Sequence, residues 1–304
     1  MDSHRMETGL DWQQIEWDQL ELDDLIAIQR KVRTAIDAQR KLQGKQRLLE
    51  SAPPSKGLMP EPLYQGKERY RTLVNRVAPA QIRSSLDKLD GCMLGVSLGG
   101  GNAAVFQGAK LEAIVRWIAP RTRRCSVLVG DSLGRISLQV REGMDPETAE
   151  REARALGQRY AAETEALFRR YTSETVTFEF KFGTEYAKHP CFEPYLANVR
   201  ALYAKDAAFQ QLVHDFGDMY LQRTATSIGE ARLTERWQQL AREYLLEEIA
   251  LLACLAADGW TTLVYPGSID SIIEIAEGRY PALPSPLKDL GFVALWLDSK
   301  SGAR

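Results

Sequence analysis

Short runs of consecutive apolar residues alternate with longer segments of helical periodicity through the chain after residue 90. The apolar runs predict buried strands at 92–96, 126–130, 260–264 and 292–297, and residues 175–180 alternate as a further strand. Apolar residues that recur every three or four positions predict helices at 105–118, 147–170, 192–222 and 233–256. Strands separated by helices are typical of an α/β fold, in which helices cover both faces of a mostly parallel sheet.

The first 50 residues carry a separate helical pattern, in which Trp12, Ile15, Trp17 and Leu20 begin an apolar stripe. Residues 51–62 then contain four prolines and a glycine, which cannot continue a helix. We therefore predict a helical N-terminal extension over 1–50, a Pro-rich linker over 51–62 and an α/β domain over 63–304.

The length, charge and cysteine content of the chain limit the classes of protein to which it can belong. The 304 residues fit one large α/β domain with a short appendage, and 39 basic against 41 acidic residues do not indicate a nucleic-acid-binding protein as a whole. No apolar run is long enough to span a membrane, and the first residues lack the apolar stretch of a signal peptide. The four cysteines form no C-x-x-C pair, so we expect neither a metal site nor a disulfide framework, and a cytoplasmic location.

Three polar residues directly follow predicted strands. They are Ser97, Asp131 and Tyr265. The carboxyl ends of parallel strands meet at one edge of a sheet, where ligands bind in such folds. We therefore expect these three side chains to share one rim.

The segment Gly95-Val-Ser-Leu-Gly99 matches G-x-S-x-G, the turn that exposes a nucleophilic serine between a strand and a helix. The alternative is a glycine-rich turn in which Ser97 caps the next helix. A hydrolase of this class needs a histidine late in the chain, and no histidine follows His214. The missing late histidine therefore argues strongly against a serine hydrolase triad.

The same turn satisfies a second pattern, because Gly99-x-Gly101-x-x-Ala104 fits the loose dinucleotide-binding spacing and Asp131 could accept a ribose hydroxyl. A nicotinamide-dependent oxidoreductase is thus one alternative function. Asp131 lies farther from the glycines than the usual ~20 residues, which weakens this interpretation.

Tyr244 and Glu248 lie four residues apart on a predicted helix, so their side chains share one face. Leucines flank both, and a carboxylate among apolar residues needs a partner. The alternative is that Glu247 and Glu248 form an exposed pair. Tyr265 ends a buried strand beside Pro266, where its phenol could reach a pocket or simply pack.

The 147–170 helix balances its arginines with glutamates, so the tighter basic cluster of Arg121, Arg123 and Arg124 is the better candidate for contacting phosphate.

From about residue 90 to its end, the chain resembles the tRNA-dependent cyclodipeptide synthases. The resemblance rests on an ordered set of motifs: Gly95-Val-Ser-Leu-Gly99, Trp117, Val129-Gly-Asp131, Tyr244-x-x-x-Glu248 and Val264-Tyr-Pro266. It implies a Rossmann-like domain similar to the catalytic domain of class I aminoacyl-tRNA synthetases, and the chain has none of their ATP-binding signatures. One subgroup of the family has a variable residue three positions after the serine and a Tyr-Pro pair. The chain resembles this subgroup, because Gly100 stands at the variable position and Pro266 follows Tyr265.

The resemblance implies roles for individual residues. Ser97 would be the nucleophile, Tyr244 and Glu248 would hold the amine of the aminoacyl group, and Tyr265 would lie beside the serine as the proton relay. Gly99 and Gly100 would let the ester approach the backbone. The remaining substrate-contacting residues would be Asp131 and Pro266 at the rim, Met93, Leu128, Leu251 and Leu252 in the first pocket, and Gln222 and Arg223 near the second.

The implied reaction joins two amino acids taken from two aminoacyl-tRNAs by a ping-pong mechanism. Ser97 takes the first aminoacyl group, the amine of a second aminoacyl-tRNA attacks the seryl ester, and an enzyme-bound dipeptidyl group cyclises to a diketopiperazine. An aminoacyl-tRNA is already an activated ester, so no cofactor is needed, and neither DNA nor a membrane is expected as a partner.

Two features set the chain apart within that resemblance. The long helix that is strongly basic in well-known members is nearly balanced here, so tRNA contacts are expected at Arg121, Arg123 and Arg124. Residues 12–17 and 28–32 resemble the N-terminal domain of group II intron reverse transcriptases, which implies an added RNA-binding or scaffolding element over residues 1–50. The alternative is a helical hairpin that packs on the core. A non-catalytic RNA-binding module is the remaining alternative.

Overall fold

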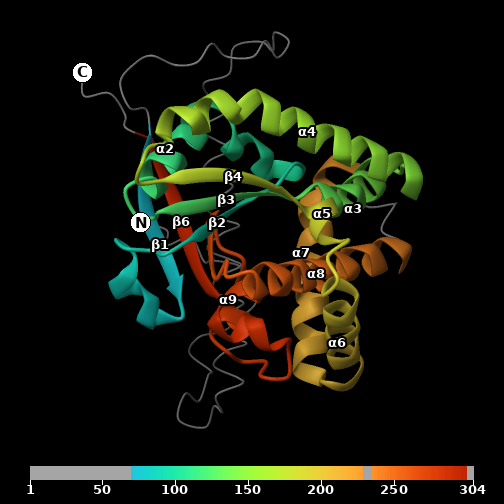
Figure 1. The fold of residues 1–304 in the computed structure, drawn as a ribbon. Coiled ribbons are helices and arrows are strands. Elements are labelled where there is room, and N and C mark those ends of the chain that lie inside the picture. The colour runs from blue at the N-terminus through green and yellow to red at the C-terminus, as the bar shows by residue number, and fades with distance from the viewer. Residues whose placement is uncertain (1–69, 229–234, 300–304) are drawn as a thin grey trace, which may run out of the picture. The chain divides into compact units, whose positions relative to one another are not determined.

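The computed structural model describes residues 70–228 and 235–299, in which six strands form one sheet (Figure 1). The strand order is β1-β6-β5-β2-β3-β4. All neighbouring pairs are parallel except β1 and β6, which are antiparallel. The strands are β1 (Tyr70–Ala78), β2 (Cys92–Val96), β3 (Arg124–Val129), β4 (Thr177–Phe182), β5 (Thr262–Pro266) and β6 (Gly291–Ser299). The mostly parallel sheet is as predicted, whereas the predicted N-terminal extension and linker lie outside the described residues.

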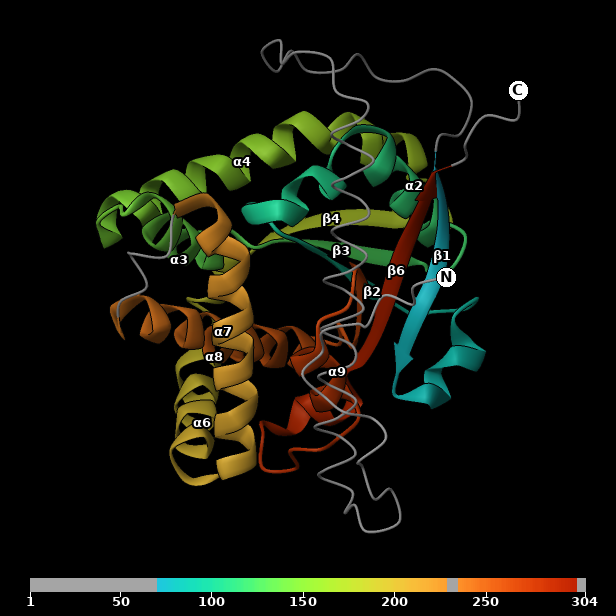
Figure 2. The ribbon, with the colours of Figure 1, turned by 180° about the vertical axis from the view of Figure 1, so that it is seen from behind.

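Helices connect the strands and flank the sheet (Figures 1 and 2). The α-helices are α2 (Gly108–Ile118), α3 (Asp131–Glu142), α4 (Pro146–Tyr171), α5 (Gly183–Tyr186), α6 (Phe192–Lys205), α7 (Ala207–Ile228), α8 (Glu235–Ala257) and α9 (Asp270–Ala276). The short 3-10 helices are η3 (Ala80–Ser85), η4 (Gly100–Phe106) and η6 (Ser285–Asp289).

Two predicted helices differ from the structure. The helix expected over 105–118 begins only at Gly108, whose φ is +52° and which follows the extended residue Gln107. The helix expected over 192–222 is two helices, because the extended residue Asp206 separates them. The Asp206 carboxylate accepts a hydrogen bond from the Phe209 backbone at 2.9 Å and so caps the start of α7.

Each face of the sheet has its own apolar core. On one face, residues of α6, α8 and α9 enclose the strand residues Met93, Leu263 and Phe292. On the other face, α2 and α4 cover Leu94, Val127 and other buried strand residues. Burial on both faces explains why these strands read as continuous apolar runs in the sequence.

The order of the strands reverses at β2. Along the chain the sheet grows from β2 to β3 and β4, and the connection after β4 then returns to place β5 on the other side of β2. A crevice beyond the carboxyl ends of the strands forms at such a switch point in open α/β sheets. Ser97 follows β2 and Tyr265 lies near the end of β5, so the fold brings both residues to this position.

Candidate active site

Ser97 is the first residue after β2 and is half-buried. Its hydroxyl donates a hydrogen bond of 3.2 Å to the carbonyl oxygen of Gly99, two residues further on. A Cβ atom built on Gly99 would lie 3.3 Å from the Cβ atom of Ser137 on α3. The serine loop therefore packs closely against α3, and a larger residue at position 99 would disturb this contact.

Tyr265 lies next to the serine strand because Gly95 leaves space for it. A Cβ atom on Gly95 would lie 3.4 Å from Cδ2 of Tyr265 and 3.2 Å from Cδ1 of Leu263. The half-buried Tyr265 ring also contacts Phe106, with ring centroids 5.8 Å apart. The first glycine of the G-x-S-x-G segment thus accommodates a tyrosine on the neighbouring strand.

Tyr244 and Glu248 lie on α8 and are both half-buried. The Tyr244 ring packs against Tyr220 and Phe216 of α7, with centroid distances of 5.1 and 5.8 Å. Burial raises the pKa of Tyr244 well above its usual value, and the nearby Glu248 and Tyr265 add to that effect. The structure therefore brings Tyr265 into the electrostatic environment of the Tyr244–Glu248 pair.

Glu248 differs from Glu243 and Glu247 of the same helix, which both form ion pairs. Among the described residues it makes no hydrogen bond or ion pair, and burial raises the pKa of its carboxyl to about 7. A carboxyl group with such a pKa can bind a positively charged amine when ionised and can exchange a proton with it near neutral pH. This is the chemistry that a site for the amino group of an amino acid requires.

Asp131 lies at the expected rim but is almost completely buried, with 1% of its surface exposed. Its Oδ1 accepts hydrogen bonds from the backbone of Ser132 and Thr184, and its Oδ2 accepts one of 2.6 Å from the Thr184 hydroxyl. These bonds join α3 to α5. The serine loop also leads into a 3-10 helix rather than the long helix that a dinucleotide-binding turn opens, so the geometry does not favour the nicotinamide alternative.

The other expected substrate residues fall into two groups. Met93, Leu251 and Leu252 are buried in one core cluster, against which Leu128 packs, and Pro266 is buried at the end of β5. Gln222 and Arg223 are exposed on α7. The apolar residues thus lie together on the face of the sheet that α8 covers, whereas the two polar residues face solvent.

The three expected phosphate-binding arginines lie at the opposite edge of the sheet from Ser97, because Arg124 begins β3 whereas Ser97 follows the end of β2. Arg121 stacks on Trp117 at 4.7 Å, and Arg124 stacks on Trp260 at 4.5 Å. The exposed guanidinium of Arg123 makes no hydrogen bond or ion pair with another described residue. On α4, ion pairs neutralise Arg154 and Arg169 with glutamates four residues earlier.

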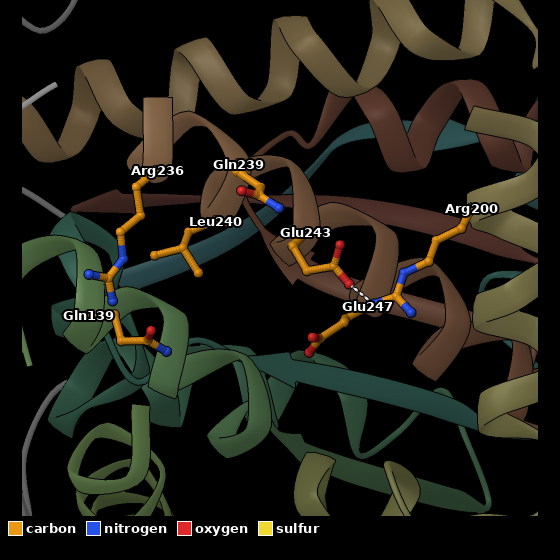
Figure 3. A pocket seen from close by; sticks show the side chains of 7 residues that line it. All are labelled: Gln139, Arg200, Arg236, Gln239, Leu240, Glu243 and Glu247. Carbon is orange, nitrogen blue, oxygen red and sulfur yellow. Dashed lines mark hydrogen bonds and ion pairs between the residues drawn. The ribbon is translucent and has the colours of Figure 1, made fainter. Parts of the chain in front are cut away.

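A pocket of about 420 Å³ lies beside the N-terminal half of α8 (Figure 3). Its lining residues are Gln139, Arg200, Arg236, Gln239, Leu240, Glu243 and Glu247. Ion pairs join Arg200 to Glu243 and Arg135 to Glu247. None of the expected catalytic residues lines this pocket.

The two histidines of the described residues are engaged elsewhere. His214 is hydrogen-bonded to the Tyr203 hydroxyl at 2.8 Å, and Nε2 of His189 lies 3.7 Å from the Asp258 carboxylate. Within the described residues no group of three His, Cys, Asp or Glu side chains could hold a metal ion. In the same residues, no helix is both long and apolar enough to cross a membrane.

Sequence reasoning missed two residues of this region, Ser137 and Tyr220. Their hydroxyl oxygens lie 2.8 Å apart in a hydrogen bond between α3 and α7. They are 83 positions apart in the chain, so no local spacing could have linked them.

Solved structures of other proteins have an architecture similar to that of this chain. A solved cyclodipeptide synthase from Fluoribacter dumoffii superimposes with a TM-score of 0.66 at 21% identity, over 76% of this chain and 99% of that chain. A cyclodipeptide synthase from Candidatus Glomeribacter gigasporarum, bound to Phe-tRNAPhe, gives a TM-score of 0.55 at 19% identity, over 75% of this chain and 96% of that chain.

A Mycobacterium tuberculosis protein gives a TM-score of 0.56 at 16% identity, over 77% of this chain and 96% of that chain. Its structure is described as demonstrating that cyclodipeptide synthetases are related to type I tRNA synthetases. The Rossmann-like fold expected from the sequence is therefore confirmed.

Sequence comparison is more specific. No curated protein sequence matches the chain. A family model described as cyclodipeptide synthase matches residues 63–255, which include the serine loop and the Tyr244–Glu248 pair. Since this match spans well over half of the sequence, the chain belongs to the cyclodipeptide synthase family.

Proposed function

We propose that this protein transfers aminoacyl groups from two aminoacyl-tRNAs through a seryl ester on Ser97 and releases a cyclic dipeptide. The observation that carries the proposal is the position of Ser97 at the β2–β5 switch point, with Tyr265 on the adjacent strand and the unpaired Glu248 carboxyl beside Tyr244 on α8. The tRNA bound in the Candidatus Glomeribacter relative supports aminoacyl-tRNA as the substrate class.

In the first step the Ser97 hydroxyl oxygen attacks the ester carbonyl of an aminoacyl-tRNA. The bond to the terminal ribose oxygen breaks, a seryl ester forms, and the serine proton passes to the leaving ribose oxygen, which becomes a free hydroxyl. Tyr265 is the proposed relay for that proton, because its ring lies against β2, the strand that directly precedes Ser97. No ATP is consumed, since the tRNA ester is already activated.

The second step must run in one particular direction. The sequence predicted that the amine of the second aminoacyl-tRNA attacks the seryl ester. That attack would free Ser97 and leave the dipeptide on the tRNA. An enzyme-bound dipeptide requires the amine of the seryl-bound amino acid to attack the ester carbonyl of the second aminoacyl-tRNA. The terminal amine of the dipeptide then attacks the seryl ester, closes the ring and regenerates the Ser97 hydroxyl.

Glu248 and Tyr244 are the proposed partners of the amine that attacks in the second step. The ionised Glu248 carboxylate attracts the ammonium form and can accept its proton, which leaves the nucleophilic amine. Tyr244 keeps its phenol proton at neutral pH and can act as a hydrogen-bond donor. Gly99 and Gly100 are proposed to let the ester approach the backbone, and Met93, Leu128, Leu251 and Leu252 to surround the first side chain.

Four finer assignments are also proposals. We propose that the chain belongs to the Tyr-Pro subgroup, on the basis of Gly100 and Pro266. Gln222 and Arg223 are proposed to lie near the second substrate. Residues 1–50, which lie outside the described structure, are proposed to add an RNA contact. The exposed Arg123, together with Arg121 and Arg124, is proposed to contact tRNA phosphates.

The test is to mix the protein with a complete pool of charged tRNAs, then measure its intact mass and analyse the small molecules for diketopiperazines. Wild type should form a cyclic dipeptide, and an aminoacyl-sized adduct should accumulate wherever the ester lives long enough. Ser97→Ala should form neither. Ser132→Ala is the matched control, because Ser132 lies at the same rim and its buried hydroxyl has no hydrogen-bond partner among the described residues. A wild type that yields no cyclic dipeptide, or a Ser97→Ala variant that still does, would contradict the proposal.

A further inference from the structure

The helices α3, α7 and α8 meet in a small apolar cluster beside the candidate site. Ile136 and Val140 of α3, Leu221 of α7 and Ala241 of α8 are its buried members, and Tyr220 and Tyr244 pack against it. The helix that borders the serine loop therefore contacts the two helices that carry Tyr220 and Tyr244.

One hydrogen bond lies at the edge of this cluster. The hydroxyl oxygens of Ser137 and Tyr220 are 2.8 Å apart, and both residues are half-buried. Burial raises the pKa of Tyr220, so its phenol stays protonated at neutral pH. The bond links α3 directly to α7.

The two ends of this bond face the two halves of the candidate site. On the α3 side, the Ser137 Cβ atom lies 3.3 Å from the position that a Cβ atom on Gly99 would occupy, and the Gly99 carbonyl accepts the hydrogen bond of Ser97. On the α7 side, the Tyr220 ring packs on the Tyr244 ring with centroids 5.1 Å apart. A continuous series of contacts thus runs from the nucleophile loop to the amine-binding tyrosine.

We propose that Tyr220 and Ser137 are positioning residues that fix the separation between the Ser97 loop and the Tyr244–Glu248 pair. The inference rests on the proposed function. In a seryl-bound amino acid only the carbonyl carbon and the α-carbon separate the ester oxygen from the amine. The amine can therefore reach Glu248 only if the serine loop and α8 hold one fixed separation.

This arrangement predicts an effect on reaction rate rather than on substrate binding. The residues proposed to surround the first side chain belong to a different apolar cluster from the one that Tyr220 packs against, so KM should change little. The orientation of the attacking amine does depend on it, and small misplacements of reacting groups reduce rates strongly.

The test compares Tyr220→Phe, Ser137→Ala and the double variant with wild type. Tyr203→Phe is the matched control, since it removes a tyrosine hydrogen bond of the same 2.8 Å length, to His214, between α6 and α7. Acyl-enzyme is formed first, its amount is measured by intact mass, and its conversion to cyclic dipeptide is then followed after adding the second aminoacyl-tRNA. Rates are expressed per molecule of acylated protein, so a loss of folded protein does not change the compared rates. Thermal unfolding is recorded in parallel.

Tyr220→Phe and Ser137→Ala should each lower the conversion rate about 10-fold, with KM unchanged within about 2-fold, and the double variant should be no slower than either. Tyr203→Phe should convert at the wild-type rate even if its unfolding temperature falls. A wild-type rate in Tyr220→Phe, an equal loss in Tyr203→Phe, or additive losses in the double variant would overturn the positioning role. A wild type that makes no cyclic dipeptide would overturn the proposed function itself, and the inference with it.

Discussion

Glu247 and Glu248 are consecutive residues of α8, but only Glu247 forms an ion pair among the described residues, with Arg135 of α3. Burial raises the pKa of both carboxyl groups, and for Glu247 the positive charge of Arg135 opposes that rise. Glu248 has no such compensation, and its pKa reaches about 7. The protein therefore maintains a partly buried carboxyl that is easily protonated beside Tyr244, at a cost in stability.

The first prediction is that Glu248→Gln stabilises the protein above pH 7 while it abolishes cyclic dipeptide formation. The unfolded carboxyl ionises near pH 4.5 and the folded one near pH 7, so the folded state binds more protons between these values. Stability is therefore lost as pH rises from about 4.5 to about 7. Removing the carboxyl should recover about 3 kcal/mol at pH 8 and nothing at pH 4, measured by urea unfolding at both values.

The adjacent position supplies the control for this prediction. Glu247→Gln should lower stability at pH 8, because it leaves the partly buried Arg135 without its ion-pair partner. If Glu248→Gln unfolds at the same urea concentration as wild type at pH 8, the carboxyl is not held in an unfavourable environment.

A second prediction concerns Tyr244→Phe. The ring contacts with Tyr220 and Phe216 remain in this variant, so its unfolding temperature should stay close to that of wild type. Loss of a hydrogen bond to a charged amine should slow turnover by about 10- to 100-fold. Steady-state kinetics and thermal unfolding check both parts.

Tyr186→Phe is the contrasting variant for that measurement. It removes the 3.1 Å hydrogen bond from Tyr186 of α5 to Asp258, and neither residue is among the expected site residues. Its stability should fall while its turnover stays unchanged, and equal turnover losses in both tyrosine variants would argue against a specific role for Tyr244.

The third prediction tests where tRNA binds. Arg123→Ala should raise the Kd for tRNA and reduce the slope of log Kd against log salt by about one, because one phosphate contact is lost. Arg159→Ala, which removes an exposed arginine without an ion pair among the described residues of α4, should leave both quantities unchanged. The reverse result would place the tRNA on α4 despite its balanced charge.

The fourth prediction concerns the contact between α4 and the start of α3. A Cβ atom on Gly157 would lie 2.9 Å from the Cβ atom of Asp131, which is held in place by its bonds to Thr184. Gly157→Ala should destabilise the protein by about 1–3 kcal/mol, since this strain exceeds the gain in helix propensity of about 1 kcal/mol. Chemical denaturation provides the measurement.

Gly217→Ala on α7 is the matched substitution. Its new Cβ atom would meet the flexible Arg242 side chain at 3.3 Å, so the helix-propensity gain should leave stability unchanged or higher. Equal destabilisation in both variants would show that the close approach at Asp131 is not the cause.

The fold was predictable where burial is strong on both sides of a strand. β2, β3, β5 and β6 are continuous apolar runs because helices cover both faces of the sheet. β1 was missed because it is an edge strand whose exposed and half-buried residues alternate, with Arg71, Asn75 and Arg76 among them. The helix α3 was missed because Asp131, its first residue, was interpreted as a polar rim residue after a strand and not as the start of a helix.

The candidate site was predictable only where its chemistry is local in sequence. The G-x-S-x-G segment and the Tyr244–Glu248 spacing are visible without a structure, and the fold places both near Tyr265. Long-range partners were not visible. Arg135 pairs with Glu247 from 112 positions away, so the sequence could not show which of two adjacent glutamates would be left without a partner.

β2 and β5 are neighbours in the sheet, although two strands and every helix from α2 to α8 lie between them in the chain. A ribosome makes the chain from its N-terminus, so the serine loop is synthesised long before the helix and strand that supply Tyr244, Glu248 and Tyr265. On the proposed mechanism, a nascent chain surrounded by aminoacyl-tRNAs holds a serine but not the residues that activate it. On that mechanism the seryl ester cannot form until β5 has been made, so the order of the elements delays the reaction until the late part of synthesis.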